Sequence, residues 1–442
     1  MQFHEKFLYH IWDAQHILKS AKTISGKPVS VLSPGRWNTF SGPDFKNGVL
    51  KIGDQLCKGD IEVHHYTNDW KHHNHDENQQ FNDVILHVVY EHNGNYDVTI
   101  TENGNKIEIL ELKNILDDDI EKLLTLYSED QFAQKEKFCS FFAMLEPDSF
   151  ELLMKHLGME RLERKIKRFS AELYFSSFDQ LVYSGIMEAL GYSKNKFQMI
   201  SFANELTYDR LKEFYYKGIT QDEMIAIWLY STGLIEGVKK NIEPEKLEKW
   251  EDAYRSQNYF HRELNIEWKS FRIRPVNHPG MRMIQIAPII YDSLKDSLML
   301  HLLKLFSFPE DSFSMRTFMK KLYEFFASEK ISKKKSMGKA RIDTIFINII
   351  LPLVMLYAKK MDYEKLEHTA LSIYLKYKGL PENHIITYMK TYMDSSQKKK
   401  NNAHAYIQQA LIQLYYDFCQ SYSCNACTEK RNSILELKNN KV

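Results

Sequence analysis

The side chains best suited to chemistry are concentrated between residues 42 and 87 of this 442-residue chain. The stretch begins with Gly42-Pro43-Asp44-Phe45 and continues with Gly59-Asp60-Ile61-Glu62-Val63-His64. Further groups able to bind a metal or move a proton follow, together with one tryptophan: Asp69, Trp70, His73, His75 and His87. Such a density of carboxylates and imidazoles beside glycine-rich loops exceeds what solubility requires and indicates a functional site.

Glu62 and His64 are two positions apart. On a β-strand they project from the same face, while Ile61 and Val63 point into a core. If Asp44 begins the neighbouring strand, it brings a second carboxylate to Glu62. Two converging carboxylates form an oxygen site suited to Mg²⁺ or Mn²⁺, which can activate water and hold a phosphate. The competing interpretation is that Asp44 caps a turn and that Glu62 and His64 form a solvated strand face.

His72, His73 and His75 are a second candidate, because the His-x-His spacing of His73 and His75 on an extended segment can present both rings to one Zn²⁺. His64 or Asp69 would be the third ligand. The alternative is that these histidines are solvated or hydrogen-bonded in a polar loop. His87 is expected to be a histidine of the core, and Trp70 is expected to pack as a lid over the site.

The third candidate is the C-terminal group Cys419-x4-Cys424-x2-Cys427. Three thiols at this spacing could hold zinc or an iron–sulfur cluster, with Cys139 or a histidine as the fourth ligand. The alternative is a set of helix-end cysteines without a metal. Five cysteines in so long a chain are no disulfide framework, so a reducing, cytoplasmic location is expected.

Basic residues form two runs that could contact the phosphates of a nucleic acid. The residues concerned are Arg164, Lys165 and Arg168 in the first run and Lys333 and Lys334 in the second. Most such runs are solvated helix faces, and Glu160 and Glu163 partly neutralise the first. The net charge of +1 does not itself indicate a nucleic-acid partner.

The pattern of apolar residues predicts a mixed α/β domain up to residue 115. Apolar positions at three- and four-residue intervals predict a helix over residues 3–18. Alternation and turn residues predict strands over 28–32, 49–52, 61–65, 84–90, 97–101 and 107–110, with a loop at 33–45 and a short helix within 68–82. The segments 49–52 and 61–65 are expected to pair as a hairpin, as are the last two strands.

Beyond Ile115 the period changes to that of helices. We therefore predict an α+β protein with a mixed α/β domain at 1–115, a connecting helical segment at 116–146, an all-α region at 147–437 and a polar tail at 438–442. The chain exceeds the roughly 250 to 300 residues of a single core, so at least two domains are expected. The apolar run 345–358 contains Asn348 and Pro352 and is too short to span a bilayer, which predicts a buried helix and no membrane partner.

Two resemblances follow from these motifs. Asp44 and Glu62-Val63-His64, behind an N-terminal helix carrying Glu5, resemble the PD-(D/E)XK nuclease superfamily, whose fold is restriction-endonuclease-like. The resemblance implies that Asp44 and Glu62 bind a divalent ion, that Glu5 adds a ligand, and that His64 stands where the family usually has lysine. The whole chain also resembles an uncharacterised bacterial family of unknown function with GPDF, GD-[IV]-E-[IV]-H and DW-x-x-H-x-H signatures.

Three functions are consistent with these observations. The first is a metal-dependent nuclease in which Asp44 and Glu62 hold Mg²⁺ or Mn²⁺ and His64 orients the attacking water or the phosphate. The second is a non-catalytic helical adaptor whose α/β domain keeps a nuclease-like shape. The third is a zinc hydrolase that uses His64, His73 and His75. Substrate and oligomeric state are not determined by the sequence.

Overall fold

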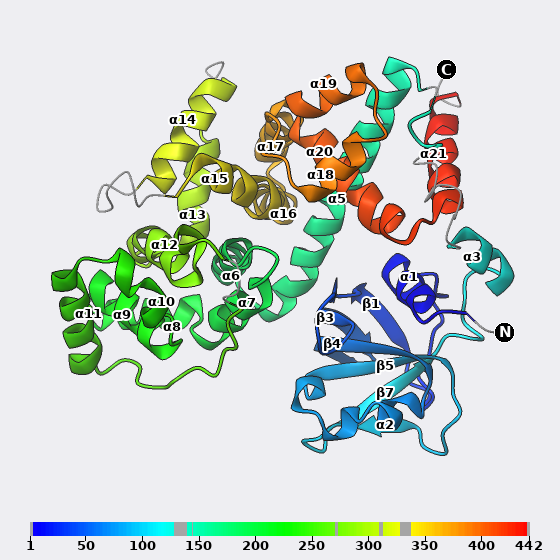
Figure 1. The fold of residues 1–442 in the computed structure, drawn as a ribbon, viewed down its shortest axis with the longest axis horizontal. Helices are drawn as coiled ribbons and strands as arrows, with labels where there is room; N and C mark the ends of the chain where they lie inside the picture. Colours follow the sequence, from blue (N-terminus) through cyan, green and yellow to red (C-terminus); the bar gives the residue numbers. More distant parts are fainter. Residues whose placement is uncertain are drawn as a thin grey trace. The chain divides into compact units, whose positions relative to one another are not determined.

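The computed structural model describes residues 3–127, 139–143, 145–269, 273–308, 313–327 and 337–439. The protein is of the α+β class, with a mixed sheet near the N-terminus and helices over most of the remaining chain (Figure 1). Contacts divide the chain into two compact units. Unit 1 contains Met1–Ala171, Asn383–Lys399 and Ile407–Val442, and unit 2 contains Glu172–Glu382 and Lys400–Tyr406. The expected boundary at residue 115 marks the change of secondary structure. The contacts, however, place the helical residues up to Ala171, together with the C-terminal helices, in unit 1.

The sheet of unit 1 is built from seven strands in the described residues. The elements follow the chain as α1 (Lys6–Ala14), β1 (Val29–Ser33), β2 (Arg36–Trp37), β3 (Phe45–Ile52), β4 (Gln55–Tyr66), α2 (Asp69–His72), β5 (Val84–Glu91), β6 (Val98–Ile100) and β7 (Lys106–Glu111). The strand order is β1-β3-β4-β5-β7-β6, with β2 paired to β3. β3 and β4 form an antiparallel hairpin, whereas β4, β5 and β7 are mutually parallel.

The two faces of the sheet have separate cores, as alternation along β4 requires. Ile61 and Val63 are completely buried among apolar side chains of α1, including Leu8 and Trp12. Burying each such side chain contributes about 2 kcal/mol. The other core surrounds Trp70 of α2, which packs with Phe81, Val84 and Ile107. Figure 1 shows α1 and α2 on either side of the sheet. Because Ile61 and Val63 point into the core with α1, alternation makes Glu62 and His64 point away from it.

The elements differ from the predicted ones mainly at their ends. α1 is shorter than the predicted 3–18 and stops at Gln15, which adopts a left-handed conformation with φ of 59°. β3 begins at Phe45, where a loop was expected, because Phe45 pairs with Ile61 of β4. The short helix predicted within 68–82 is confirmed as α2, followed by two 3-10 turns at His75–Glu77 and Gln79–Phe81.

Helices complete unit 1. They are α3 (Ile120–Leu126), α5 (Pro147–Glu172), α18 (His384–Lys390), α19 (Ser395–Ala403), α20 (Ala405–Asp417) and α21 (Cys424–Asn439). The expected connecting segment 116–146 contains α3, and its residues 128–138 and 144 lie outside the described ones. The expected polar tail begins inside α21, and its residues 440–442 are likewise outside the description.

Unit 2 is helical. Its helices are α6 (Phe178–Leu190), α7 (Lys196–Glu205), α8 (Tyr208–Tyr216), α9 (Gln221–Ser231), α10 (Ile235–Val238), α11 (Pro244–Ser256), α12 (Pro279–Ser293), α13 (Leu298–Leu303), α14 (Met315–Phe326), α15 (Lys339–Ile345), α16 (Leu351–Lys360) and α17 (Glu364–Lys376). The stretch Lys339–Lys360 is long and apolar enough to cross a membrane, with mean hydropathy 1.7, yet 78% of its most apolar window is buried inside the protein. The prediction of a buried helix at 345–358 is therefore confirmed.

Candidate metal centre

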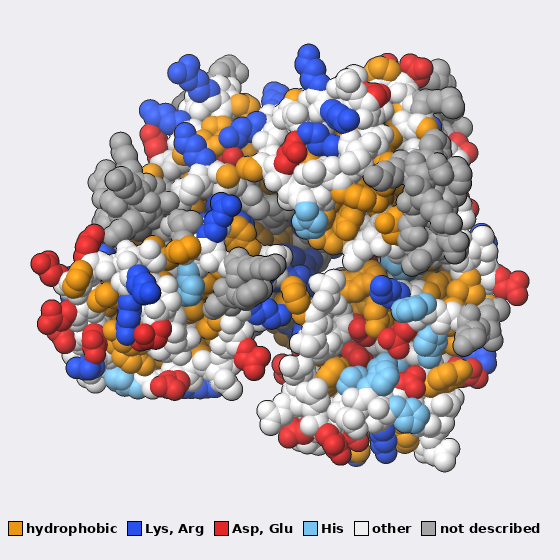
Figure 2. Space-filling view, viewed as in Figure 1, with side chains coloured by type: hydrophobic (Ala, Val, Ile, Leu, Met, Phe, Trp, Pro, Cys, Tyr) orange, Lys and Arg blue, Asp and Glu red, His pale blue; other side chains and the backbone are white. Residues whose placement is uncertain are grey.

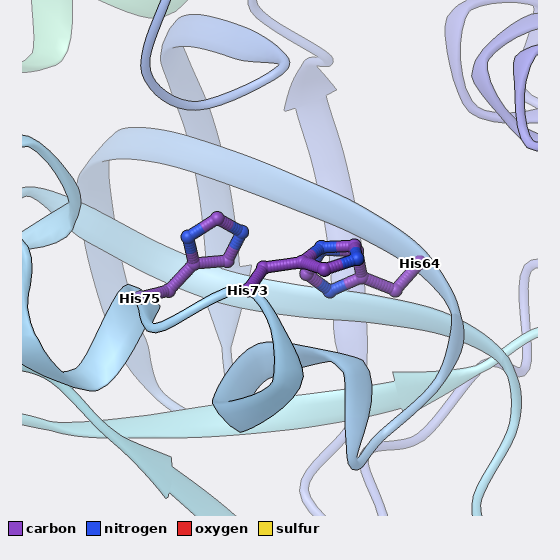
Figure 3. A group of neighbouring side chains, drawn as sticks. All are labelled: His64, His73 and His75. Carbon is purple, nitrogen blue, oxygen red and sulfur yellow. The ribbon is translucent and has the colours of Figure 1, made fainter.

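Three histidines that stand apart in the sequence meet beside the sheet. His64 belongs to β4, His73 follows α2, and His75 begins the next 3-10 turn. One ring nitrogen of each lies within 4.8 Å of the corresponding nitrogens of the other two. Figure 3 shows the rings of His64 and His73 close together, with that of His75 beside them. The structure thus brings together the three imidazoles that the sequence suggested as zinc ligands.

The backbone between α2 and the 3-10 turn explains how His73 and His75 reach the same place. Asn74 adopts a left-handed conformation with φ of 55°, which asparagine tolerates better than most residues. Asp69 stabilises the start of α2, because its Oδ2 accepts the backbone N–H of Tyr66 at 2.9 Å. Its other oxygen lies 3.5 Å from Nδ1 of His72. Asp69 therefore supports the turn, and the third imidazole comes from His64.

Glu62 adds a carboxylate to the three imidazoles. Its Oε1 lies 3.4 Å from Nε2 of His64 and 3.2 Å from Nε2 of His75. Burial opposes ionisation of Glu62, but His64 and His75 lower its pKa below the usual value. The side chain is therefore a buried carboxylate within reach of two candidate ligand nitrogens.

The environment of His75 shows that this group of residues fits a metal ion. Only 9% of His75 is exposed, and its ring stacks on Phe81 with centroids 3.7 Å apart. Neither of its ring nitrogens has a hydrogen-bond partner in the described structure. The contact of Nε2 with Glu62 is close, but it lacks hydrogen-bond geometry. Buried polar atoms are rarely left without a partner, and a cation between the imidazoles and Glu62 would supply one.

A second layer of hydrogen bonds orients His64. Nδ1 of His64 lies 2.9 Å from Nε2 of His87, and Nδ1 of His87 lies 3.4 Å from Oγ1 of Thr99. Complete burial holds the pKa of His87 well below its usual value, so this ring is neutral. A neutral His87 that donates from Nδ1 to Thr99 accepts a hydrogen bond at Nε2 from Nδ1–H of His64. Nε2 of His64 then carries the lone pair, and it faces His73 and Glu62. This is the tautomer that a metal ligand requires.

His73 forms the solvent side of the centre. Its Nδ1 lies 3.1 Å from Nε2 of His64, and its side chain is exposed. Burial, followed by the charges of His64 and His75, lowers the pKa of His73. Figure 2 shows histidine and acidic side chains gathered on the surface of the sheet domain. The centre is therefore open to solvent on one side and closed by Trp70, His87 and Phe81 on the other.

Asp44 and Glu62 are joined by reciprocal hydrogen bonds across β3 and β4. The backbone N–H of Asp44 donates to Oε2 of Glu62 at 3.0 Å, and the N–H of Val63 donates to Oδ2 of Asp44 at 3.0 Å. Burial and the charge of Glu62 raise the pKa of Asp44 well above its usual value. The two acids are neighbours, as the pattern of the strands suggested, and each keeps one oxygen that these backbone bonds do not use.

Tyr9 is a site residue that sequence reasoning missed. Its hydroxyl donates to Oε1 of Glu5 at 2.8 Å and also hydrogen-bonds Asp44. Burial, Asp44 and Glu5 raise the pKa of Tyr9, so its hydroxyl stays protonated. Glu5 is thus connected to the centre through Tyr9. The signal in the sequence was weak: Tyr9 stands four positions after Glu5 and shares its helix face.

Two residues of the motifs have structural positions. Trp70 is not a lid, because it is completely buried, donates from Nε1 to the carbonyl of Ile100 at 3.0 Å and lies beneath His75 and His87. Asp60 is bonded to residues of β3. It accepts hydrogen bonds from Nζ of Lys46 at 2.6 Å and from the backbone N–H of Asn47 at 3.0 Å, which fixes the β3–β4 hairpin.

The predicted phosphate-contacting residues of α5 are engaged within unit 1. Arg164 pairs with Asp417 at 3.0 Å and with Glu160 at 3.1 Å. Lys165 donates to Gln409 at 2.7 Å, and the guanidinium of Arg168 lies over the ring of Phe169. Lys333 and Lys334 lie outside the described residues. Arg164 and Lys165 thus join α5 to α20.

Comparison with known proteins identifies a family without assigning an activity. Residues 5–383 match the model of a family described as a protein of unknown function, DUF2851. No curated protein and no solved structure matches the chain. The match covers the sheet, its histidine centre and the helices of unit 2, and on this basis the chain belongs to the DUF2851 family.

Proposed function

We propose that the sheet domain is a metal-dependent phosphodiesterase whose divalent ion is held by His64, His73 and His75 together with Glu62. The observation that carries the proposal is the convergence of three imidazole nitrogens within 4.8 Å beside the buried carboxylate of Glu62. Imidazole ligands favour first-row transition ions such as Zn²⁺ or Mn²⁺ over Mg²⁺. When bound, such an ion would lower the pKa of a water molecule and polarise a phosphoryl oxygen.

The protein's own residues would position that ion and handle the proton. Oε1 of Glu62 lies 3.4 Å from Nε2 of His64 and 3.2 Å from Nε2 of His75, where all three atoms could bind one ion, and the chain from Thr99 through His87 keeps Nε2 of His64 unprotonated. Asp44 is suited to accept the proton of the attacking water at Oδ1, because its raised pKa makes it a better base than an ordinary carboxylate. The hydroxyl of Tyr9 donates to Glu5 and also hydrogen-bonds Asp44, and so fixes the orientation of that base.

The choice of a phosphodiester substrate rests on the resemblance to the PD-(D/E)XK nucleases. It is supported by Asp44, directly before β3, which is hydrogen-bonded with Glu62 of β4, and by Glu5, the residue before α1, which accepts the hydroxyl of Tyr9. The centre differs by its additional histidines, and the nearby cation, Lys46, is bound to Asp60. A site rich in imidazole is consistent with an ion that supplies the positive charge itself.

Hydrolysis assays test this function. Full-length protein stripped by a chelator and reloaded with Zn²⁺, Mn²⁺ or Mg²⁺ is incubated with bis(p-nitrophenyl) phosphate and with single- and double-stranded DNA and RNA. We expect cleavage with Zn²⁺ or Mn²⁺, and a loss of roughly 100-fold or more in Glu62→Gln and Asp44→Asn. His72→Ala is the matched control, since His72 is exposed beside His73 and outside the centre. Absence of cleavage with every metal, or full activity in both acid variants, would refute the proposal.

A second candidate is favoured by the reciprocal bonds of Asp44 and Glu62. These acids, with Glu5, could hold Mg²⁺ without the histidines, as in the nuclease-like interpretation. The two candidates differ in their response to His75→Ala, which should abolish activity in the first and leave Mg²⁺-dependent activity intact in the second. The adaptor interpretation predicts neither metal affinity nor cleavage.

A further inference from the structure

Four of the five cysteines gather in one place within unit 1. Cys419 follows α20, Cys424 begins α21, and Cys427 is one helical turn further along. Residues three apart on a helix lie on the same face, so the sulfurs of Cys424 and Cys427 project together. Tyr422 adopts a left-handed conformation with φ of 55°, which reverses the chain between Cys419 and α21. The local backbone therefore folds the three C-terminal thiols toward one another.

Cys139 reaches this group from a segment far away in the sequence. The hydroxyl of Ser140, the next residue, lies 2.9 Å from that of Thr428, which directly follows Cys427. Arg431, one turn further along α21, donates to the carbonyls of Ser140 and Ala143. These bonds hold Cys139 beside α21. Burial, followed by the proximity of Cys139 and Cys424, raises the pKa of Cys419, and Cys427 also responds to all three other thiols.

The four clustered cysteines are reduced and have hydrogen-bonding and aromatic neighbours. All five cysteines are thiols, and four of them are clustered without forming a disulfide. Burial raises the pKa of Cys139, and hydrogen bonds from the backbone N–H groups of Phe142 and Phe141 to its sulfur oppose this rise. Tyr388 lies against Tyr392 and Tyr415 near Cys419, and this aromatic group limits access of water. Four clustered thiols, of which Cys427 is buried and the others are partly buried, are typical of a site that binds a soft metal centre.

From this arrangement we propose that Cys139, Cys419, Cys424 and Cys427 hold an iron–sulfur cluster. A single zinc ion would draw its four sulfurs to about 3.8 Å from one another, given a Zn–S bond of about 2.3 Å in a tetrahedron. In the described part of the chain, no three of these sulfurs lie within 4.8 Å of one another. A cluster binds each thiolate at a different iron and so accepts the wider spacing. Each thiol loses its proton when its sulfur binds iron.

The cluster would connect distant parts of unit 1. It closes the chain between residue 139 and the C-terminal helix, which hydrogen bonds of Ser140 and Arg431 already bring together. The proposal does not rest on the phosphodiesterase function, because the histidine centre is built from other residues. A cluster that survives His75→Ala would show this independence directly.

The experiment is anaerobic purification of the full chain from iron-supplemented cells, followed by iron and acid-labile sulfide analysis, visible absorption and electron paramagnetic resonance after reduction. We expect about four irons and four sulfides per chain. Cys427→Ser and Cys139→Ser should each lose at least half of the iron, whereas Cys57→Ser, outside the group on β4, should keep it all. Since a cysteine variant could fail to fold, the metal-free native chain is also reconstituted with Fe²⁺ and sulfide.

Appearance of the cluster spectrum in the reconstituted native chain supports the proposal. Zinc without iron in the purified protein, together with no cluster on reconstitution, would overturn it. A full cluster in Cys139→Ser would overturn the assignment of the fourth ligand.

Discussion

The candidate site depends on side chains that are useful only in one protonation state. His64 is suited to bind a metal through Nε2, because its Nδ1–H donates a hydrogen bond to Nε2 of the neutral His87 ring. Asp44 holds its proton more tightly than an ordinary carboxyl because it is buried beside Glu62. The protonation state of each of these two side chains is therefore set by a neighbouring side chain.

His10 of α1 gives a prediction for stability against pH. Burial lowers its pKa from 6.5 to about 4, while its ring stacks on Tyr127 and meets Trp37 edge-on. The unfolded chain takes up a proton at His10 below pH 6.5, but the folded chain does not until about pH 4. The folded state should therefore lose up to roughly 3 kcal/mol as pH falls through this window, and none of this loss occurs above it.

Replacing His10 by phenylalanine tests this explanation. The aromatic ring is kept and the titration removed, so the free energy of unfolding should depend less on pH between 6.5 and 4 than in the native chain. Urea unfolding at several pH values measures the difference, with the exposed His72→Phe as control. An unchanged pH dependence in His10→Phe would show that the ring is not the source of the effect.

Part of the candidate site was predictable from single residues. Alternation on a strand placed Glu62 and His64 on one face, and the motif preceding β3 placed Asp44 beside Glu62. Tyr9 and the Thr99–His87 relay were not predicted, since their roles come from contacts between elements that are far apart in the sequence. The place of Trp70 was predicted wrongly, because sequence position does not show which face of a helix the sheet will cover.

At the scale of elements, the crossover from β4 to β5 positions the centre. The two strands are parallel, with Glu62 opposite His87 and His64 opposite Val89. The connection carries α2 and the turn with His73 and His75 back over the same face of the sheet. The sequence predicted the strands and the β3–β4 hairpin, but strand periodicity alone does not distinguish parallel from antiparallel pairing of β4 and β5.

Gly59 is required where β4 meets the start of β5. A Cβ at this position would lie 2.5 Å from the carbonyl oxygen of Asp83 and 2.4 Å from the side chain of Ile85. Because one of these neighbours is backbone, Gly59→Ala should destabilise the protein by about 2 kcal/mol and weaken metal binding by separating β4 from β5. Gly338→Ala adds the same methyl group in open space and is the control. Equal melting temperatures of the two variants would contradict this assignment.

At the scale of the whole molecule, unit 1 is completed by residues from the far end of the chain. Arg161 of α5 donates to Gln409 and Gln413 of α20, and Lys430 of α21 pairs with Glu160 at 2.9 Å. The pattern of the sequence suggested a break at residue 115, because periodicity reports secondary structure and not contacts between distant helices. The mixed α/β and helical parts were predicted, but the return of the C-terminal helices to α5 was not.

A truncated chain tests this organisation. Ending the protein at Glu382 removes α18 to α21 and the partners of Arg161 and Arg164, so α5 should become sensitive to protease. The helices α6 to α16 of unit 2 keep their neighbours and should stay resistant. A chain that ends at Asn439 retains these helices and should digest like the native protein. Limited proteolysis with mass spectrometry identifies the cleavage sites. Equal resistance of α5 in both chains would mean that unit 1 does not need its C-terminal segments.

The most direct test of the central claim is titration of the metal-free protein with Co²⁺, followed by its visible ligand-field absorption. We predict that one ion per chain binds through nitrogen and oxygen, and that its ligand-field absorption is lost in His73→Ala and His75→Ala but not in His72→Ala. A sulfur-to-cobalt charge-transfer band would come from the four cysteines and should be unchanged in these histidine variants. If Co²⁺ does not bind, or binds equally well to the His75→Ala variant, then the three histidines and Glu62 are not a metal centre.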